Sequence, residues 1–241
     1  MLQQNFSQGA FRSVAYARMP DGQRMVAKRI LRERSRLESN VRELEGDLRA
    51  SLLAQKVAAA FNDPEARGSS ISAGTVHYPA GSILIISEAQ VLGGQAAHLV
   101  EPYLQRTSRW QKWINNDGSL ATACGEPDVP EVLSAFCHFS LIHLAETEAL
   151  PHMILDIQGL QPDTNSLYHL TDPAISTQDP NVSQYYGETN LGRSAMYNFL
   201  AHHQCGSTCI SLGLDNNIRT ARALDLTQAE VDHIEDLVAF E

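Results

Sequence analysis

The chain has few cysteines, and it has neither a long hydrophobic run nor a secretory leader. Its 241 residues include four cysteines, too few for the disulfide framework that stabilises small secreted domains. No stretch approaches the roughly 18 consecutive apolar residues of a membrane helix, and the N-terminus lacks the basic and then apolar pattern of a secretory signal. We therefore expect an intracellular, cytoplasmic protein with no membrane partner.

Basic residues are also scarce. Eighteen Lys and Arg stand against 28 Asp and Glu, which gives a formal net charge of −10. Proteins that bind nucleic-acid backbones need a clustered excess of positive charge, so the composition predicts no nucleic-acid partner. Hydrophobic residues make up 43% of the chain, enough to bury a core as one large domain or as two lobes.

Hydrophobic periodicity predicts an α+β chain. Alternating segments from Phe6 to Ile30 surround a turn at 19–22, which is typical of a β-hairpin. Apolar residues recur at helical spacing from Glu38 to Phe61, and the apolar run at 83–86 predicts a buried, central strand. The other expected elements are a strand with an extended connector at 98–104, a polar, turn-rich segment at 112–130, a helix at 132–144, a strand at 153–157, a helix at 193–212 and a capping box at 227–230.

The order of these elements predicts one domain over residues 1–241 with two lobes. The first lobe, residues 1–100, is rich in predicted strands, and the second lobe covers residues 101–241. Nucleotide sites often lie between such lobes.

A histidine and two cysteines near the C-terminus have the spacing of a metal site. Cys205 and Cys209 are four residues apart, so on a helix they share one face, and His203 lies just upstream. Structural zinc takes four protein ligands. The residues that remain open as the fourth ligand are His138, His143, His152, His202 and Cys137. The alternative is two buried cysteines and a surface histidine, but the spacing favours zinc.

Polar side chains at the end of the predicted strand at 153–157 indicate a second site. A strand alternates its faces, so Asp156 and Gln158 are expected to point the same way. An ionised Asp is costly to bury without partners, so this face should open onto a cleft or a cation. Asp172 follows after a loop and can join them, and Mg²⁺ accepts carboxylate, amide and phosphate oxygens. The alternative for each residue alone is a structural role, such as capping a turn.

Two further features suit phosphates. Lys28 lies on the second strand of the predicted hairpin, where a lysine can reach nucleotide phosphates, although strand-edge lysines are usually just solvated. The segment at 187–192, which includes Asn190 and Gly192, directly precedes a predicted helix. Backbone N–H groups and the helix dipole favour an anion there, but an ordinary turn explains the segment nearly as well.

Taken in order, these residues and their neighbours resemble the alpha-kinases, a family of atypical protein kinases. The resemblance covers nearly the whole chain. The segments that carry it are 6–12, Val26-Ala27-Lys28, 100–104, 112–118, 135–139, Leu155-Asp156-Ile157-Gln158-Gly159, 170–173, 189–192 and His203-x-Cys205-x3-Cys209. Because the chain begins close to the family's first strand, we expect no accessory domain within it.

The resemblance implies an ATP-dependent protein serine/threonine kinase with a protein substrate. Asp156 would orient or deprotonate the acceptor hydroxyl, and Lys112 would lie near the transferring phosphoryl group. Glu101 would lie at the adenine edge through its backbone or side chain. The implied nucleotide-binding residues are Arg12, Lys28, Glu101, Gln158, Asp172, Asn190 and Gly192.

The resemblance also implies two metals. Gln158 and Asp172 would hold magnesium against the ATP phosphates. Zinc would be structural and would lie in the C-terminal lobe of a two-lobed alpha-kinase fold, with His138 as the fourth ligand. The implied zinc ligands are His138, His203, Cys205 and Cys209.

Two other functions compete with this interpretation. A zinc-braced pseudokinase, acting as a nucleotide-binding or interaction domain, is favoured by the long segment between Glu101 and Lys112. Lys28 and Asp156, together with the expected magnesium ligands, favour an active kinase. A zinc-dependent nucleic-acid module is disfavoured by the acidic charge.

Overall fold

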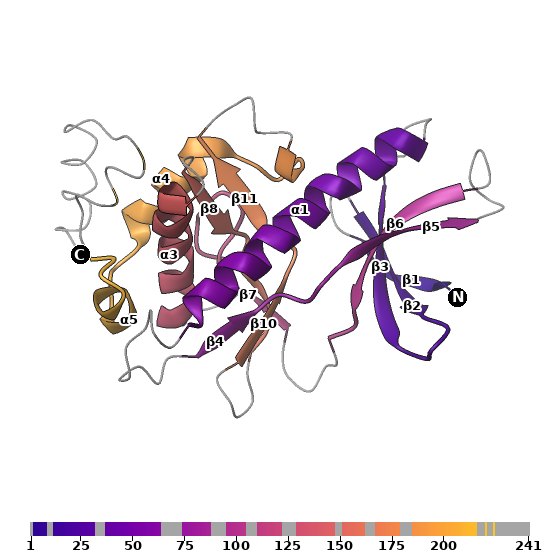
Figure 1. The fold of residues 1–241 in the computed structure, drawn as a ribbon, viewed down its shortest axis with the longest axis horizontal. Helices are drawn as coiled ribbons and strands as arrows, with labels where there is room; N and C mark the ends of the chain where they lie inside the picture. The colour runs from indigo at the N-terminus through magenta and orange to yellow at the C-terminus, as the bar shows by residue number, and fades with distance from the viewer. Residues whose placement is uncertain are drawn as a thin grey trace.

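The fold is an α+β arrangement of three sheets and four helices in the part of the chain that the computed structural model describes. The described residues are 2–8, 12–31, 37–63, 74–87, 95–104, 110–121, 129–147, 151–161, 167–178, 185–215, 220 and 224. A five-stranded sheet lies at one end, the other elements gather at the opposite end, and one long helix runs between them (Figure 1).

The first sheet is built around the predicted hairpin. Its strands are β1 (Leu2–Gln8), β2 (Arg12–Arg18), β3 (Arg24–Ile30), β5 (Ser82–Ser87) and β6 (Gln95–Pro102), in the order β1-β2-β3-β6-β5. β2 and β3 pair antiparallel from Arg12↔Ile30 to Arg18↔Arg24, and Gly22 adopts the positive φ of 91° in the turn. The hairpin prediction is therefore confirmed.

The position of β5 differs from the expectation. The apolar run at 83–86 does form a strand, but this strand pairs only with β6 among the described strands and lies at the edge of the sheet. Ile85 is 55% exposed. The prediction of a buried, central strand is wrong, because an apolar run predicts burial but not the strand's position in the sheet.

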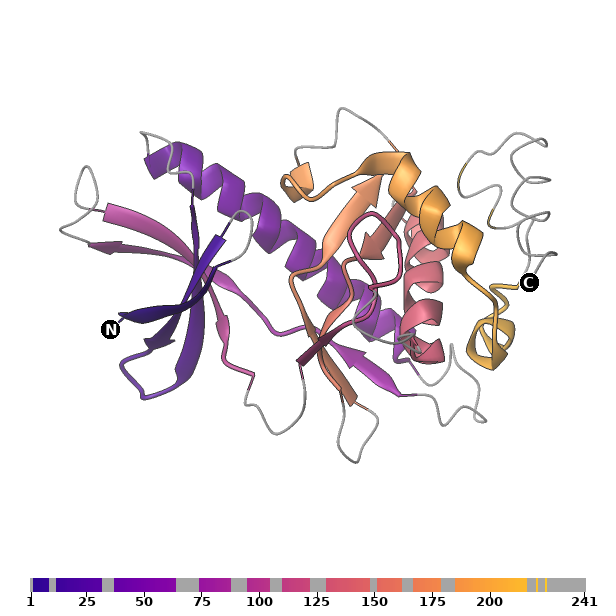
Figure 2. The same ribbon diagram turned by 180° about the vertical axis from the view of Figure 1, so that it is seen from behind.

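A second group of strands and helices forms the larger core (Figure 2). A four-stranded sheet has the order β4-β10-β9-β7, and β8 and β11 form a separate antiparallel pair. These elements are β4 (Thr75–His77), β7 (Trp110–Lys112), β8 (His152–Leu155), β9 (Gln158–Leu160), β10 (Leu167–Thr171), β11 (Ala174–Thr177), α3 (Glu131–Thr147), α4 (Gly192–His202) and α5 (Ser207–Ser211).

The long helix α1 (Leu37–Phe61) packs against both groups. Near its start, Leu44 packs with residues of β3, β5 and β6. Near its end, Phe61 belongs to the larger core and meets Phe136 of α3 edge to face, with ring centroids 5.3 Å apart. The lobe boundary at residue 100 remains a prediction. The second half of α1 and strand β4 lie before residue 100, but they pack in the larger core with residues that follow residue 100.

Three predicted elements end or divide elsewhere. The strand expected at 153–157 ends at Leu155, and the helix expected at 193–212 is two helices with an extended break at 203–206. The segment expected to be polar and turn-rich contains Trp113 and Ile114, which are fully buried core residues. The capping box at 227–230 lies outside the described residues.

None of the described helices combines the length and the apolar character needed to cross a membrane.

Candidate functional site

A cavity of about 580 Å³ lies where the first sheet faces the four-stranded sheet. Strands β2, β3 and β6 line it from one side, together with α1. The residues around β9 and β10 line it from the other side, including Asp156, Gln158 and Asp172. The cavity thus brings together residues that are up to 177 positions apart, from Arg12 to Thr189.

A buried lysine joins the two sides of this cavity. Lys28 Nζ on β3 lies 2.5 Å from Glu101 Oε2 on β6 and also pairs with Asp172, just after β10. Thr171 Oγ1 donates to the Glu101 carboxylate over 3.0 Å. Burial alone would lower the pKa of Lys28, but Asp172 and Glu101 outweigh it and raise the pKa. Lys28 is therefore a fixed cation at neutral pH.

Glu101 is one of the residues that line the cavity. Its side chain is buried and bonded to Lys28 and Thr171. The next residues, Pro102 to Leu104, line the cavity with apolar atoms. Tyr103 donates its backbone N–H to the Arg24 carbonyl over 3.0 Å, so this stretch is tied to the hairpin.

Asp156 lies at a break between two strands. Its φ is 57°, in the left-handed region that non-glycine residues seldom adopt and that Asp tolerates better than most. β8 ends before it and pairs with β11, whereas β9 begins after it and pairs with β10 and β7. The expected alternation of Asp156 and Gln158 along one strand is therefore wrong. The two side chains still meet, because Gln158 Nε2 donates to Asp156 Oδ2 over 3.2 Å.

The carboxylate of Asp156 also binds a lysine. Lys112 Nζ on β7 lies 2.5 Å from Asp156 Oδ1. Burial raises the pKa of the Asp156 carboxyl, while Lys112 opposes the rise through its hydrogen bond and its charge. A carboxylate with a raised pKa accepts protons more readily than an exposed one.

The residue after Gln158 has to be glycine. Gly159 has a φ of 154°, and a Cβ at this position would lie 2.0 Å from the carbonyl oxygen of His169 on β10. The missing side chain lets β9 approach β10, and this contact places Gln158 opposite Thr171 at the cavity.

Arg12 lines the cavity with its guanidinium bound to α1. Its Nη1 lies 2.8 Å from Glu43 Oε1, and its Nε and Nη2 lie 2.9 and 2.8 Å from Asp47 Oδ2. Sequence reasoning missed both acids. Their signal was an i, i+4 acidic pair on a predicted helix, which usually marks a solvated face.

Asn190 and Gly192 lie beside the cavity and do not line it. Asn190 Oδ1 accepts from the backbone N–H of Thr177 over 3.1 Å and from that of Gly192 over 2.9 Å. The amide therefore fastens the start of α4 to the end of β11. Glu188 and Thr189, from the predicted segment at 187–192, do line the cavity, although the sequence pattern assigned neither of them an individual role.

The cavity also has an apolar wall, of which the sequence indicated only the segment at 100–104. Tyr16 and Tyr103 stand edge to face at this wall, with their ring centroids 5.4 Å apart. The apolar lining residues are Val14, Tyr16, Val26, Pro79, Leu99, Pro102, Tyr103, Leu104, Trp110 and Pro173.

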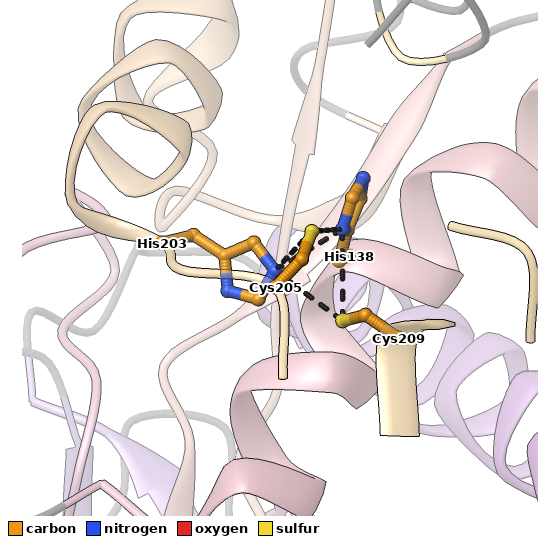
Figure 3. Close-up of side chains that lie close together, drawn as sticks. All are labelled: His138, His203, Cys205 and Cys209. Atoms are coloured by element: carbon orange, nitrogen blue, oxygen red, sulfur yellow. Dashed lines mark hydrogen bonds between the residues drawn. The ribbon is translucent and has the colours of Figure 1, made fainter. Parts of the chain in front are cut away.

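A second cluster lies outside the cavity, where α3, α4 and α5 meet (Figure 3). It consists of His138, His203, Cys205 and Cys209, whose ligand atoms all lie within 4.8 Å of one another. His138 Nδ1 and His203 Nε2 are 3.1 Å apart. The four distances from these nitrogens to the two sulfurs run from 3.4 to 3.9 Å.

These distances fit a tetrahedral zinc site. With Zn–N of about 2.1 Å and Zn–S of about 2.3 Å, the edges of the tetrahedron are roughly 3.4 Å between nitrogens and about 3.6 Å between nitrogen and sulfur. The outer ring nitrogens also have partners, since His203 Nδ1 lies 2.7 Å from Ser134 Oγ and His138 Nε2 lies 2.9 Å from Thr220 Oγ1. Such contacts orient histidine ligands. Of the fourth-ligand candidates, the structure places His138 in the cluster.

The two cysteines reach the cluster from different local structures. Cys205 lies in the extended segment before α5, and Cys209 lies on α5. The expectation that they share one helix face is therefore wrong. Glu131 at the start of α3 accepts the backbone N–H of Thr208 over 2.6 Å, which aligns the short helix with α3.

Comparison with known proteins finds one family whose model matches most of the chain. The alpha-kinase family model matches residues 7–209. Myosin heavy chain kinase C of Dictyostelium discoideum is 32% identical over 124 residues, which are 52% of this chain and 13% of that protein. The chain spans between 5% and 13% of the length of the curated relatives that it matches.

Solved structures agree with the fold. An alpha kinase from Entamoeba histolytica superposes with a TM-score of 0.68 at 26% identity, over 88% of this chain and 76% of that one. The alpha-kinase domain of myosin-II heavy chain kinase A in complex with AMP-PNP superposes with a TM-score of 0.63 over 89% of this chain and 87% of that one. At 19% identity, the second likeness shows the fold alone.

Proposed function

The chain belongs to the alpha-kinase family, and from this premise we propose that it is a protein kinase that transfers the γ-phosphoryl group of ATP to a serine or threonine hydroxyl of a protein. The observation that carries the proposal is the cavity in which Lys28 joins Glu101 to Asp172 while Asp156 and Gln158 stand beside them. The solved relative in complex with AMP-PNP supports a nucleotide at the corresponding place.

We propose that the nucleotide base occupies the apolar part of the cavity, between the hairpin and residues 102–104. The phosphates would then extend toward Lys28, whose raised pKa keeps it charged. Arg12 is held at the same end by Glu43 and Asp47 and would be a further contact for the phosphates. The side chain of Glu101 would act on the nucleotide through Lys28, and Asn190 and Gly192 would position the neighbouring loop.

In the proposed reaction, Asp156 receives or orients the proton of the acceptor hydroxyl. The acceptor oxygen bonds to the γ-phosphorus while the bond from that phosphorus to the ADP oxygen breaks. Lys112 is bonded to Asp156. It would lie near the transferring phosphoryl group and would stabilise the negative charge of that group electrostatically.

Gln158 and Asp172 are the proposed magnesium ligands. An amide oxygen and a carboxylate oxygen suit Mg²⁺, which takes few protein ligands and keeps several waters. When bound, the metal would neutralise phosphate charge. Asp172 pairs with Lys28 in this structure, so magnesium binding would share this carboxylate with the lysine.

We propose that the cluster of His138, His203, Cys205 and Cys209 holds structural zinc. Four protein ligands leave no open position for a substrate, and the cluster is separate from the residues that line the cavity. Thiolate ligands and the use of ATP fit a reducing compartment, so we also propose an intracellular location. We further propose that the chain forms one kinase domain with two lobes.

The test is transfer of labelled phosphate from ATP to a generic basic protein. Asp156→Ala should abolish transfer, because removing a general base costs about 10²- to 10⁴-fold. Asp215→Asn, an exposed position away from the cavity, is the matched control and should retain transfer. No transfer by folded wild-type protein with magnesium would refute the proposal.

A further inference from the structure

One face of the four-stranded sheet carries the site residues in a row. Lys112 on β7 is paired with Gln158 on β9, which is paired with Thr171 on β10. Directly opposite residues of neighbouring strands point to the same face. Gln158 and Thr171 line the cavity, and Lys112 reaches Asp156 from the same row. The opposite face, with Leu170 and Val76, packs into the core.

A second row lies two residues along the strands. Trp110 is paired with Leu160, Leu160 with His169, and His169 with His77. This row points to the same face as the first because side chains alternate along a strand. At about 3.3 Å per residue, the two rows are roughly 7 Å apart. Trp110 therefore lies one step along the sheet from the lysine that binds Asp156.

Trp110 is unusual among the residues that line the cavity. It is 42% exposed, and the other apolar lining residues come from the first sheet or from residues 79–104 and 173. A half-exposed tryptophan beside a reaction centre presents a large, rigid apolar surface, the kind of side chain that dominates binding energy in interfaces.

The backbone of β7 is also available. β7 is the last strand in the order β4-β10-β9-β7, so among the described strands nothing pairs with its outer edge. An edge strand presents unpaired N–H and C=O groups that can add an extended peptide to the sheet. The same short strand thus offers a peptide edge, a lysine that contacts Asp156, and an exposed indole.

We propose that the acceptor segment of the protein substrate docks as an extended strand on the edge of β7, with Trp110 contacting a large apolar side chain two residues from the phosphorylated serine or threonine. The inference rests on the proposed kinase function and specifies its substrate. The spacing of two follows from the geometry, because an added strand has the same rise per residue as β7. A residue beside Lys112 therefore places its second neighbour beside Trp110.

The test uses serine peptides with leucine or alanine at each position from three before to three after the serine. For wild-type protein, we expect leucine to matter at one of the two positions that lie two residues from the serine. The peptide with leucine there should have a kcat/KM about ten-fold higher than the same peptide with alanine there. Trp110→Ala should reduce that advantage to less than two-fold, and Trp110→Phe should retain most of it. Leu52→Ala, at an exposed position on α1, is the matched control and should retain all of it.

Two further readouts separate the possible explanations. The dissociation constant for nucleotide should change less than two-fold in Trp110→Ala, and a change above five-fold with peptide selectivity intact would place Trp110 at the base and overturn the proposal. Methylation of alternate peptide amides should lower kcat/KM about ten-fold in one register only, and an equal effect in both registers would overturn strand addition. The docking proposal would also be overturned if leucine gave no advantage over alanine at either position two residues from the serine.

Failure of the kinase function can be recognised separately. Fluorescence anisotropy of the labelled peptides measures docking without phosphoryl transfer. If no transfer occurs but leucine-dependent binding is lost in Trp110→Ala, the docking surface stands and the kinase proposal fails. If peptides are phosphorylated but Trp110→Ala changes neither binding nor selectivity, the kinase proposal stands and the docking surface fails.

Discussion

Two aspartates in the cavity share a backbone conformation that residues other than glycine seldom adopt. Asp156 and Asp172 have φ values of 57° and 52°. Left-handed geometry costs a non-glycine residue about 1–2 kcal/mol, so the surrounding contacts must hold it. For Asp156 these contacts are Lys112 and Gln158, and for Asp172 the contact is Lys28. In both cases the strained residue is the one to which we assign chemistry, a pattern found at functional sites.

The balance of burial and charge at Asp156 predicts a pH effect. Burial raises its pKa and Lys112 opposes the rise, so Lys112→Gln should raise the pKa of Asp156 further. Because the ionised carboxylate is the proposed active form, activity falls as pH drops through that pKa. The acidic limb of the kcat/KM profile should therefore move to higher pH in Lys112→Gln. Lys56→Gln, on the exposed face of α1, should leave the profile in place, and an unmoved limb in Lys112→Gln would contradict the assignment.

At the scale of elements, α5 depends on its neighbours. It has five residues, and isolated helices of that length are not stable in water. Glu131 binds its first turn from α3, and Cys209 is its contribution to the metal cluster. The cluster therefore joins α3, the end of α4 and α5, and adds to the hydrogen bonds that Glu131 makes between α3 and α5.

Removal of one ligand of the metal cluster should lower both zinc binding and the stability of the protein. Cys209→Ser should lower zinc from about one equivalent to below half, and should lower stability by about 3 kcal/mol, a fall in Tm of roughly 10 °C. Elemental analysis and a thermal melt measure the two effects. Ile210→Ser, at an exposed position on the same helix, should alter neither. A Cys209→Ser protein with a normal Tm would exclude the structural role that we propose for the metal.

At the scale of the molecule, the cavity has an excess of acidic groups. Its lining includes two cations, Arg12 and Lys28, and both are paired with carboxylates. The acidic lining residues are Asp47, Glu101, Asp156, Asp172 and Glu188. Such a cavity repels a free nucleotide anion and accepts one whose charge a divalent cation has reduced. Because the lining comes from both sheets and α1, a bound nucleotide should also hold the two ends of the molecule together.

This arrangement predicts metal-dependent stabilisation by nucleotide. AMP-PNP with magnesium, at about 100 times its Kd, should stabilise the protein by about 2.7 kcal/mol, which corresponds to a rise in Tm of roughly 5–10 °C. The same concentration without magnesium should raise Tm by less than about 2 °C. Asp172→Asn should abolish most of the difference, as measured by thermal denaturation. Equal stabilisation with and without magnesium would argue against Asp172 as a metal ligand.

Local sequence patterns predicted much of the architecture. The hairpin at 12–30, the helix at 37–61 and the helix at 131–147 follow from alternation and helical periodicity, because these depend on neighbours a few residues apart. The ordered motifs also placed the chain in its family, which the family model confirms. The same patterns failed at Asp156 and at 203–206, where tertiary contacts end an element earlier than periodicity predicts.

By itself, then, the sequence determined the local elements, the excess of acidic charge, the residues capable of the chemistry and the family. Only the tertiary structure decided how these residues meet. It brought Lys28 to Asp172 across 144 positions and His138 to His203 across 65. It also bound Arg12 to α1 and left the edge of β7 beside Asp156. The reason is physical, because periodicity reports forces between sequence neighbours, whereas these contacts depend on how whole sheets and helices pack.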